Sequence, residues 1–487
     1  MGDNGFWKPF LYSVILCIGL LIGYIIPENS SNKFIEVLDI VNKDYVDSVG
    51  GDLENQMISN FLTSLDPHSV YIPAKYYKYS QESLKGNYEG IGIEFDLIDN
   101  EVYVLRVVEN SPALKAGLET GDQILEANNI PFHDEELKYS AVIESLKGLS
   151  NEVLYLKIKK KDGLVKEYEI NRASVENSSI KAAFVFNNIG YINFNRFSNN
   201  SYKEFLEALT NLKEEGFKSL VIDLRGNGGG FLNEAQKIAN EFLEKGELIA
   251  YIKGKNRKIQ HFYANGNGKY KTGHLILLID NHSASASEIL AGALQDHDRA
   301  TIIGQVSFGK GLVQETFYFK DSSTLKLTVS RYYLPTGRSI QKNYASLNDS
   351  LNSDTFFTLK EKRKMIDGGG IHPDVLYPKL TNDTIERAIW YVIENSLTNK
   401  FILKKYEKQK FASPEEFVKG VNLTAKEVRD LIVQIRKKDS INLPITAQFI
   451  DKVKIQIRNK IAYNYYGTEY YHYSKVQSED WISLLKP

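Results

Sequence analysis

An alternation of strand-like and helix-like segments between residues 180 and 345 is the feature that most restricts how this chain can fold. Apolar runs such as Leu220 to Leu224 and Leu275 to Asp280 have the length of buried strands. Helical stretches such as Tyr202 to Glu215 and Leu232 to Lys245 lie between these runs. Because strands that feed crossover helices pack into parallel sheets, we predict an α/β core.

The segments on either side of this core have different patterns. Residues 31–85 carry apolar positions at helical spacing, whereas residues 86–172 carry short alternating runs between turn residues, which predicts a compact β-rich module. The chain after Pro373 is mainly helix-patterned. We therefore expect an α/β (multi-domain α+β) protein with five parts: 1–30, a helical segment at 31–85, the β-rich module at 86–172, the core at 173–378 and a helical region at 379–487.

Composition and charge exclude several classes of function. The 487 residues include 60 Lys and Arg against 61 Asp and Glu, so the net charge of -1 does not suggest a nucleic-acid partner. The one cysteine, Cys17, lies in an N-terminal apolar run, which argues against a disulfide framework, a cysteine-ligated zinc site and a cysteine nucleophile. The histidines show no close metal-ligand spacing. We expect no metal site and no cofactor.

The apolar run from Phe10 to Ile26 predicts a membrane anchor at residues 1–30. It is slightly shorter than the about 20 residues of an average membrane helix, but its aromatic ends suit the membrane interface. No small residues follow it as a signal-peptidase site requires, so we expect it to stay uncleaved. Lys8 favours a single-pass protein of the inner (cytoplasmic) membrane, with the remaining chain on the exported, periplasmic side.

Ser285 lies where a buried strand, a turn of small polar residues and a helix follow one another. With Glu288 it fits a capping box, in which the serine oxygen and the glutamate bind free amides at the helix start. A strand-to-helix turn is also where nucleophilic serines are exposed, beside a helix N-terminus that can stabilise an oxyanion. The local pattern leaves both interpretations of Ser285 open.

Lys310 ends the pattern G-x-x-x-x-G-K, which is the beginning of a phosphate-binding loop. The next residue is Gly311, so the hydroxyl that would hold Mg²⁺ is absent and nucleotide hydrolysis is disfavoured. A lysine in a loop without other charges can instead be a base, if desolvation lowers its pKa far below the ordinary value of about 10.4. A neutral amine can accept the proton of a serine hydroxyl.

Two glycine-rich segments can present free amides. The strand ending at Leu224 is followed by Arg225 and by the glycine-rich loop 226–230, which fits either a tight turn or a source of oxyanion-binding amides. In the β-rich module, the run from Gly90 to Ile93 fits a β-turn, or a loop whose amides bind a terminal carboxylate while a strand edge pairs with the ligand. The ordered motifs that continue to Ile124 favour the second interpretation.

Together these segments resemble the carboxyl-terminal processing peptidases (tail-specific proteases with a Ser-Lys dyad and a PDZ domain) over about residues 34–345 and again at 369–374. The motifs S-A-S-A-S-E, F-G-K-G-x-V-Q, D-L-R-x-N-x-G-G and G-R-S-I-Q all occur in the family's order. The resemblance implies that the core at 173–378 is a protease core similar to the crotonase and Clp-protease fold. It also implies that the module at 86–172 is an inserted PDZ domain.

The resemblance assigns catalytic roles residue by residue. Ser285 would be the nucleophile, Lys310 its general base and Gln314 the residue that orients the lysine. The amides of Ala286 and Gly229 would form the oxyanion hole.

The resemblance further implies supporting and substrate-binding residues. Glu288 and Asp296 would be supporting polar residues. The loop that binds the substrate C-terminus would consist of Gly90, Ile91, Gly92 and Ile93.

The implied function is that of an ATP-independent serine endopeptidase that processes or degrades exported proteins. Its PDZ domain would recognise protein or peptide substrates with free, apolar C-termini, and its other partner would be the membrane. A homo-oligomer and an activating adaptor are both left open. The alternative is a catalytically silent, PDZ-containing binding or scaffold protein, because related folds without the dyad bind ligands; intact Ser285 and Lys310 favour the enzyme.

Overall fold

The computed structural model describes residues 33–46, 53–74, 76–77, 86–132, 137–342, 355–377, 383–406 and 409–484. The chain divides into two compact units, Met1–Tyr71 and Ile72–Pro487. The helices described in the first unit are α2 (Lys33–Asp44) and α3 (Leu53–Thr63). Both fall within residues 31–85, where the spacing of apolar residues predicted a helical segment.

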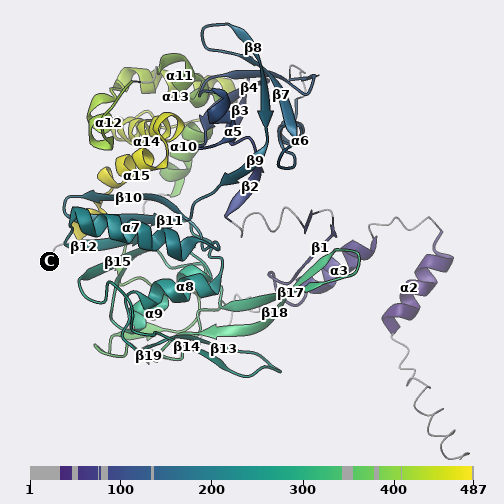
Figure 1. The fold of residues 1–487 in the computed structure, drawn as a ribbon, viewed down its shortest axis with the longest axis vertical. Helices are drawn as coiled ribbons and strands as arrows, with labels where there is room; N and C mark the ends of the chain where they lie inside the picture. Colours follow the sequence, from purple (N-terminus) through teal and green to yellow (C-terminus); the bar gives the residue numbers. More distant parts are fainter. Residues whose placement is uncertain are drawn as a thin grey trace, which may run out of the picture. The chain divides into compact units, whose positions relative to one another are not determined.

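The central sheet of the larger unit is mostly parallel (Figure 1). In spatial order its described strands are β10 (Ile180–Phe186), β11 (Ile189–Phe194), β12 (Ser219–Asp223), β15 (His274–Ile279), β16 (Thr301–Gly304) and β21 (Val375–Leu376). Strands β11 to β21 are parallel to one another, and β10 pairs antiparallel with β11 at one edge. The α/β core predicted from the sequence is confirmed.

Both faces of this sheet are buried. In β12, Leu220 and Ile222 pack into the main core cluster, whereas Val221 between them faces a second cluster that contains Trp481 from the C-terminal segment. Strands buried on both faces appear in a sequence as continuous apolar runs, as these do. The helices that belong to the main cluster are α7 (Ser201–Glu215), α8 (Leu232–Asn240) and α9 (Ala286–Asp296).

A second, antiparallel sheet is formed by chain segments that connect strands of the central sheet. It contains β13 (Leu248–Lys253), β14 (Gln260–Tyr263), β17 (Leu312–Tyr318) and β18 (Thr324–Tyr333). Strands β17 and β18 form a hairpin, and β18 also pairs with β13. The apolar run 325–329, predicted as part of the α/β alternation, is thus a strand of this second sheet, because the pattern of one strand does not specify its partner.

The β-rich module has its own sheet and its own core. The described strands of the sheet are, in spatial order, β3 (Ile93–Ile98), β4 (Glu101–Val107), β5 (Gln123–Ala127), β7 (Val153–Lys159) and β8 (Val165–Asn171), with β6 (Ile130–Pro131) paired to β5. Its helices are α5 (Pro112–Ala116) and α6 (Tyr139–Leu146), and β2 (Asn87–Gly90) pairs with β9 (Ala173–Glu176) where the module joins the core. Strand β3 is an edge strand of this sheet.

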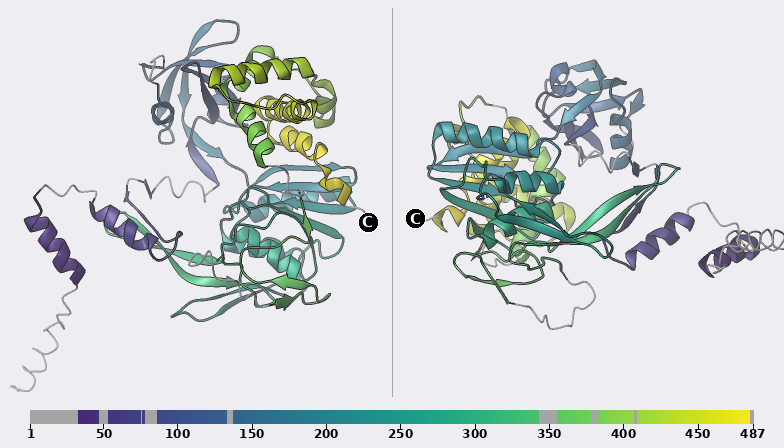
Figure 2. Two further views of the ribbon diagram at one scale, coloured as in Figure 1. Left: turned by 180° about the vertical axis from the view of Figure 1, so that it is seen from behind. Right: turned by 60° about the horizontal axis from the view of Figure 1, so that its bottom comes forward.

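The C-terminal region is helical, as predicted, and has a separate apolar core. Its described helices are α10 (Asp383–Glu394), α11 (Ser396–Lys405), α12 (Pro414–Gly420), α13 (Ala425–Asp439), α14 (Ala447–Tyr466) and α15 (Thr468–Gln477), followed by the 3₁₀ turn η1 (Asp480–Leu484). Helices α11 and α14 lie against β3 and β4 of the β-rich module (Figures 1 and 2).

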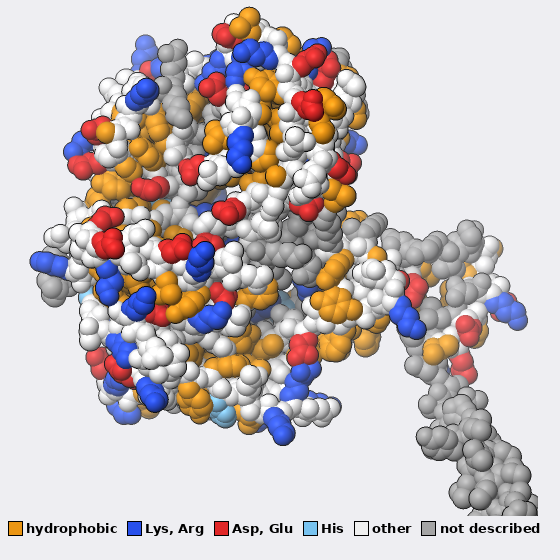
Figure 3. Space-filling view, in the orientation of Figure 1, with side chains coloured by type: hydrophobic (Ala, Val, Ile, Leu, Met, Phe, Trp, Pro, Cys, Tyr) orange, Lys and Arg blue, Asp and Glu red, His pale blue; other side chains and the backbone are white. Residues whose placement is uncertain are grey.

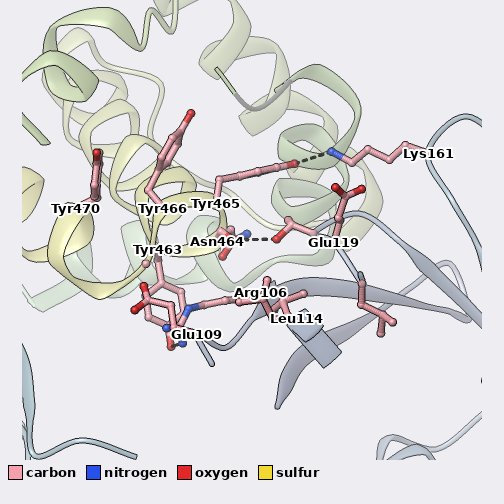
Figure 4. A pocket seen from close by; sticks show the side chains of 14 residues that line it. Arg106, Glu109, Leu114, Glu119, Lys161, Tyr463, Asn464, Tyr465, Tyr466 and Tyr470 are labelled. Atoms are coloured by element: carbon pink, nitrogen blue, oxygen red, sulfur yellow. Dashed lines mark hydrogen bonds between the residues drawn. The ribbon is translucent and has the colours of Figure 1, made fainter. Parts of the chain in front are cut away.

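Tyrosines of α14 line a cavity of about 710 Å³ between these helices and the β-rich module (Figure 4). At its rim, Lys161 Nζ donates to Tyr465 Oη at 3.2 Å, and Thr120 Oγ1 donates to the Asn464 carbonyl at 2.8 Å. Arg106 lies 4.6 Å from the ring centroid of Tyr463. The helical region is therefore bound to the β-rich module by polar and cation–π contacts.

Charged side chains are distributed without a large area of one sign. On the face drawn in Figure 3, acidic and basic side chains of the described residues are interspersed. The whole sequence has 60 basic against 61 acidic residues, and on this face the two kinds of charge are likewise mixed.

The predicted location in the inner membrane was wrong. In the described ranges given above, no helix has both the length and the apolar character that crossing a bilayer requires. The run from Phe10 to Ile26, on which the single-pass anchor and the periplasmic orientation depended, lies outside the described residues.

Candidate active site

Ser285 follows strand β15, in a turn that is fixed to the neighbouring glycine loop. Asp280 Oδ1 accepts the backbone N–H groups of Gly226, His282 and Ser283, each at 3.0 Å. The Ser283 hydroxyl donates to the carbonyl of Leu224 at 2.8 Å. Two loops at the carboxyl ends of adjacent parallel strands are therefore joined just before Ser285.

The backbone at Ser285 has an uncommon conformation. Its φ of 57° and ψ of -112° lie outside the extended region that an ordinary N-cap residue adopts. A non-glycine residue at positive φ costs roughly 1–3 kcal/mol, and such strain is concentrated at functional sites. Ser285 does form the predicted capping box with Glu288, but capping alone does not account for this backbone conformation.

Glu288 connects the serine turn to the lysine loop. Its carboxylate is 1% exposed and accepts hydrogen bonds from the N–H of Ser285 at 2.8 Å, Gly309 at 2.7 Å and Lys310 at 2.9 Å. It also accepts a short bond from the Ser307 hydroxyl. Burial raises the pKa of the Glu288 carboxyl above its ordinary value, although these hydrogen bonds favour the ionised form and limit the rise.

Lys310 is brought close to Ser285 through this carboxylate. The amide nitrogens of both residues donate to the same atom, Glu288 Oε2, so they are less than about 6 Å apart. A further bond, from the Phe308 N–H to the Ser283 carbonyl at 3.0 Å, holds the lysine loop against the serine turn. The half-buried Lys310 thus shares one neighbourhood with the half-buried Ser285.

The other predicted core residues, Gln314 and Asp296, each make polar contacts with a further segment of the chain. Gln314, on β17, donates from Nε2 to Thr328 Oγ1 on β18 at 3.2 Å. Asp296, at the far end of α9 from Ser285, forms a fully buried ion pair with Arg338 at 2.8 Å. The same carboxylate accepts the N–H and the hydroxyl of Thr336.

The segment that Asp296 holds leads back to the lysine. Gln341 Oε1, three residues after Arg338, accepts the N–H of Gly311 at 2.9 Å. Asp296 therefore supports the site from a distance, through the segment 336–341.

The glycine loop packs directly on the serine turn. A Cβ added to Gly229 would lie 2.6 Å from the Ala284 carbonyl oxygen, 2.9 Å from Ser285 Cβ and 3.0 Å from the Ala286 nitrogen. Gly229 also has a φ of +95°, which L side chains rarely adopt. Only glycine fits here without displacing the nucleophile turn. The Gly229 N–H, however, donates to Asn227 Oδ1 at 2.9 Å, so this amide already has an acceptor.

Asn227 is a positioning residue to which the sequence alone assigns no role. It is fully buried, and its Nδ2 donates to the Phe194 carbonyl at 2.7 Å. Its own carbonyl accepts the Ala284 N–H at 3.0 Å and the Ser287 hydroxyl at 2.9 Å. The signal was present, because Asn227 is the one residue of the loop 226–230 with a polar side chain. Ser307, which bonds Glu288, was missed in the same way.

Residues 90–93, which were predicted to bind a terminal carboxylate, lie at the start of the β-rich module's edge strand. The Ile91 carbonyl accepts the Ala113 N–H, and the Gly92 carbonyl accepts the Val108 N–H, both at 2.9 Å. Gly92 has a φ of +79°, and a Cβ there would lie 2.3 Å from Ser111 Cβ. The carbonyl groups of the loop 90–93 therefore bind α5 and the residue that follows β4, and the loop leads directly into the edge strand β3.

Within the part of the chain that the structure describes, no group of three or more His, Cys, Asp or Glu side chains could hold a metal ion.

Comparisons with known proteins give consistent matches. Residues 188–348 match Peptidase family S41, and residues 90–166 match the PDZ domain. The carboxy-terminal-processing protease of Bartonella bacilliformis is 34% identical over 317 residues, which cover 63% of this chain and 72% of that protein. The carboxy-terminal processing protease CtpA of Bacillus subtilis is 32% identical over 330 residues, which cover 65% of this chain and 67% of that protein.

The photosystem II D1 C-terminal processing protease has 23% sequence identity and a TM-score of 0.40, with 71% of this chain and 87% of that chain covered.

The packing of Gly229 predicts a position-specific effect. Gly229→Ala should lower the free energy of unfolding by about 1–3 kcal/mol, because it combines a strained φ with a close approach to Ser285. Gly228→Ala is the matched control, since a Cβ there would meet no atom within 4 Å, and it should change stability by no more than about 0.5 kcal/mol. Urea unfolding of both variants measures the difference; equal effects would contradict the described packing.

The raised pKa of Glu288 predicts a dependence of stability on pH. The native state holds this proton more tightly than the unfolded chain, so the contribution is fully present below the ordinary glutamate pKa of 4.5 and is lost as pH rises through the higher pKa of the folded state. Glu288→Gln cannot titrate. The unfolding free energy of the unchanged protein should therefore fall relative to that of the variant as pH rises from 4.5, in urea titrations of both proteins. A constant or widening advantage of the unchanged protein would show that the sign is wrong.

Proposed function

Because the chain belongs to the S41 family of carboxy-terminal processing peptidases, and is thus a serine-type peptidase, we propose that it cleaves peptide bonds without ATP by a Ser285–Lys310 dyad. The observation that supports this pairing best is the Glu288 carboxylate, one oxygen of which accepts the amides of both residues. The Ser285 backbone strain is a second support, because nucleophilic serines occur at strained strand-to-helix turns.

In the proposed reaction, Ser285 Oγ attacks the carbonyl carbon of the scissile peptide bond. The neutral amine of Lys310 accepts the hydroxyl proton and then gives it to the nitrogen of the leaving peptide. Water then attacks the carbonyl carbon of the resulting acyl-enzyme. Lys310 accepts a proton from this water and gives it to Ser285 Oγ as the serine leaves. Gln314, whose amide is oriented by its bond to Thr328, is proposed to accept a hydrogen bond from the Lys310 amine through Oε1.

The developing oxyanion is proposed to bind at the N-terminus of α9. The Ala286 N–H is one donor, and the positive end of the fully buried helix favours the negative charge. For the second donor we prefer Gly230 to Gly229, because the Gly229 N–H is bound to Asn227 Oδ1. Among the described residues, the N–H groups of Ala286 and Gly230 have no hydrogen-bond acceptor.

The PDZ domain is proposed to receive protein or peptide substrates by their free C-termini. An extended C-terminal segment would pair with the edge strand β3, and its carboxylate would bind the amides of the loop 90–93. The Tyr139 ring, at the start of α6, stacks on Phe95 of β3 at a centroid distance of 4.7 Å. Its hydroxyl donates to the Phe95 carbonyl at 3.3 Å, so an incoming peptide must displace this bond.

The dyad predicts that two single substitutions abolish cleavage. Ser285→Ala and Lys310→Ala should each lower kcat by about a thousandfold or more, because each removes a partner of the same proton transfer. Lys320→Ala is the matched control for loss of a lysine charge, as Lys320 is exposed, and it should retain activity. The assay uses an unstructured protein substrate with an apolar C-terminus, without ATP and with a chelator. Substantial cleavage by either dyad variant would refute the proposal.

Recognition through a terminal carboxylate predicts a dependence on the substrate's last group. Two peptides of identical sequence, one ending in a carboxylate and one in an amide, should differ about tenfold or more in KM, because the amide cannot satisfy the loop 90–93 as an anion does. Steady-state cleavage rates over a range of peptide concentrations give both values. Equal KM values would show that the carboxylate is not what the PDZ domain reads.

A further inference from the structure

Arg225, the residue before the glycine loop, is held between two carboxylates. Its Nε and Nη2 donate to Asp223 at 2.9 and 2.6 Å. Its Nη1 and Nη2 donate to the two oxygens of Glu479 at 3.0 and 2.9 Å. Such a two-oxygen contact fixes the plane of a guanidinium as well as its position.

Glu479 is oriented by the C-terminal segment itself. The indole Nε1 of Trp481 donates to Glu479 Oε2 at 2.7 Å, and the Trp481 side chain is fully buried. It packs in the cluster on the sheet face that contains Val221 and Tyr191. The contact between Glu479 and Arg225 thus rests on a rigid anchor rather than on a free surface side chain.

The other carboxylate of the network is deeply buried. Asp223 is fully buried and also accepts the Tyr191 hydroxyl at 2.7 Å. Burial alone would raise the pKa of the Asp223 carboxyl, but the charge of Arg225 and its hydrogen bonds hold that pKa below the ordinary value. Arg225 must therefore stay charged and in place, because a buried carboxylate without its partner is strongly destabilising.

The network ends at the entrance of the glycine loop. The Arg225 N–H donates to Asp223 Oδ1, and the next N–H, that of Gly226, donates to Asp280 Oδ1, both at 3.0 Å. From there the chain continues through Asn227 to Gly229, which touches Ser285. A rotation of Arg225 would consequently be transmitted to the loop from which an oxyanion donor is proposed.

We infer that Glu479, fixed by Trp481, is a positioning residue of the active site: it holds Arg225 and thereby the glycine loop that binds the oxyanion. This inference rests on the proposed function. The S41 match ends at residue 348, so Glu479 lies far outside it. The C-terminal segment would then complete the catalytic machinery without touching the substrate.

The test compares Glu479→Gln with a control, Asp480→Asn. The control also removes one negative charge, but from the next residue, whose side chain is exposed. Glu479→Gln should lower kcat about tenfold and leave KM within about twofold, because an oxyanion donor acts mainly in the transition state. Its affinity for a peptide boronate, which forms a tetrahedral adduct with the serine, should fall in proportion to kcat/KM. Asp480→Asn should match the unchanged protein in all three measurements.

Trp481→Phe provides a second variant in case Glu479→Gln does not fold. It keeps an aromatic ring in the core but removes the indole donor together with part of the buried ring volume, and it should lower kcat about threefold with KM unchanged. Folding of each variant is checked by its thermal unfolding midpoint.

Unchanged kcat in a folded Glu479→Gln or Trp481→Phe protein would overturn the inference. A loss of activity that is fully explained by the fraction of the variant unfolded at the assay temperature would overturn it as well. If Ser285→Ala still cleaves, the proposed function itself has failed. If Ser285→Ala is inactive and Glu479→Gln is fully active, only the role of Glu479 has failed.

Discussion

One buried carboxylate determines where the parts of the proposed dyad lie relative to each other. Glu288 binds the backbone at Ser285 on one side and the backbone at Gly309 and Lys310 on the other. At 1% exposure it has little access to water, so a lost donor would leave part of a buried acceptor unsatisfied. The serine turn and the lysine loop are thus constrained jointly, by main-chain bonds to Glu288 that involve neither the Ser285 hydroxyl nor the Lys310 amine.

The same principle recurs around the site with different residues. Asn227 holds the glycine loop on the serine turn, and the buried pair of Asp296 and Arg338 holds the segment whose Gln341 binds Gly311. The apolar core positions the strands, whereas these buried polar groups position the loops at the carboxyl ends of the strands. Donors arranged in this way before the substrate arrives need little reorganisation during reaction, which is where enzymes gain most electrostatic stabilisation.

The strands and helices around the site could be predicted because their apolar periodicity is local. The sheet to which the run 325–329 belongs could not be predicted, since the apolar pattern of one strand does not specify the strands with which it pairs. The resemblance predicted Gly229 as an oxyanion donor, yet the bond of its amide to Asn227 can be recognised only from the loop conformation itself. The positive φ of Ser285 is likewise invisible in a pattern that fits an N-cap. The membrane location failed because it rested on a single apolar run.

The Tyr139 contact on strand β3 has a consequence for the solubility of the protein. An edge strand such as β3, which is proposed to pair with peptides, also offers the same row of backbone groups to other strand edges, including those of further copies of the chain. A stacked ring and one hydroxyl bond at Phe95 cover part of that row while no peptide is bound. The covering group is a single side chain held by one hydrogen bond of 3.3 Å, so the proposed pairing with a peptide would break few contacts.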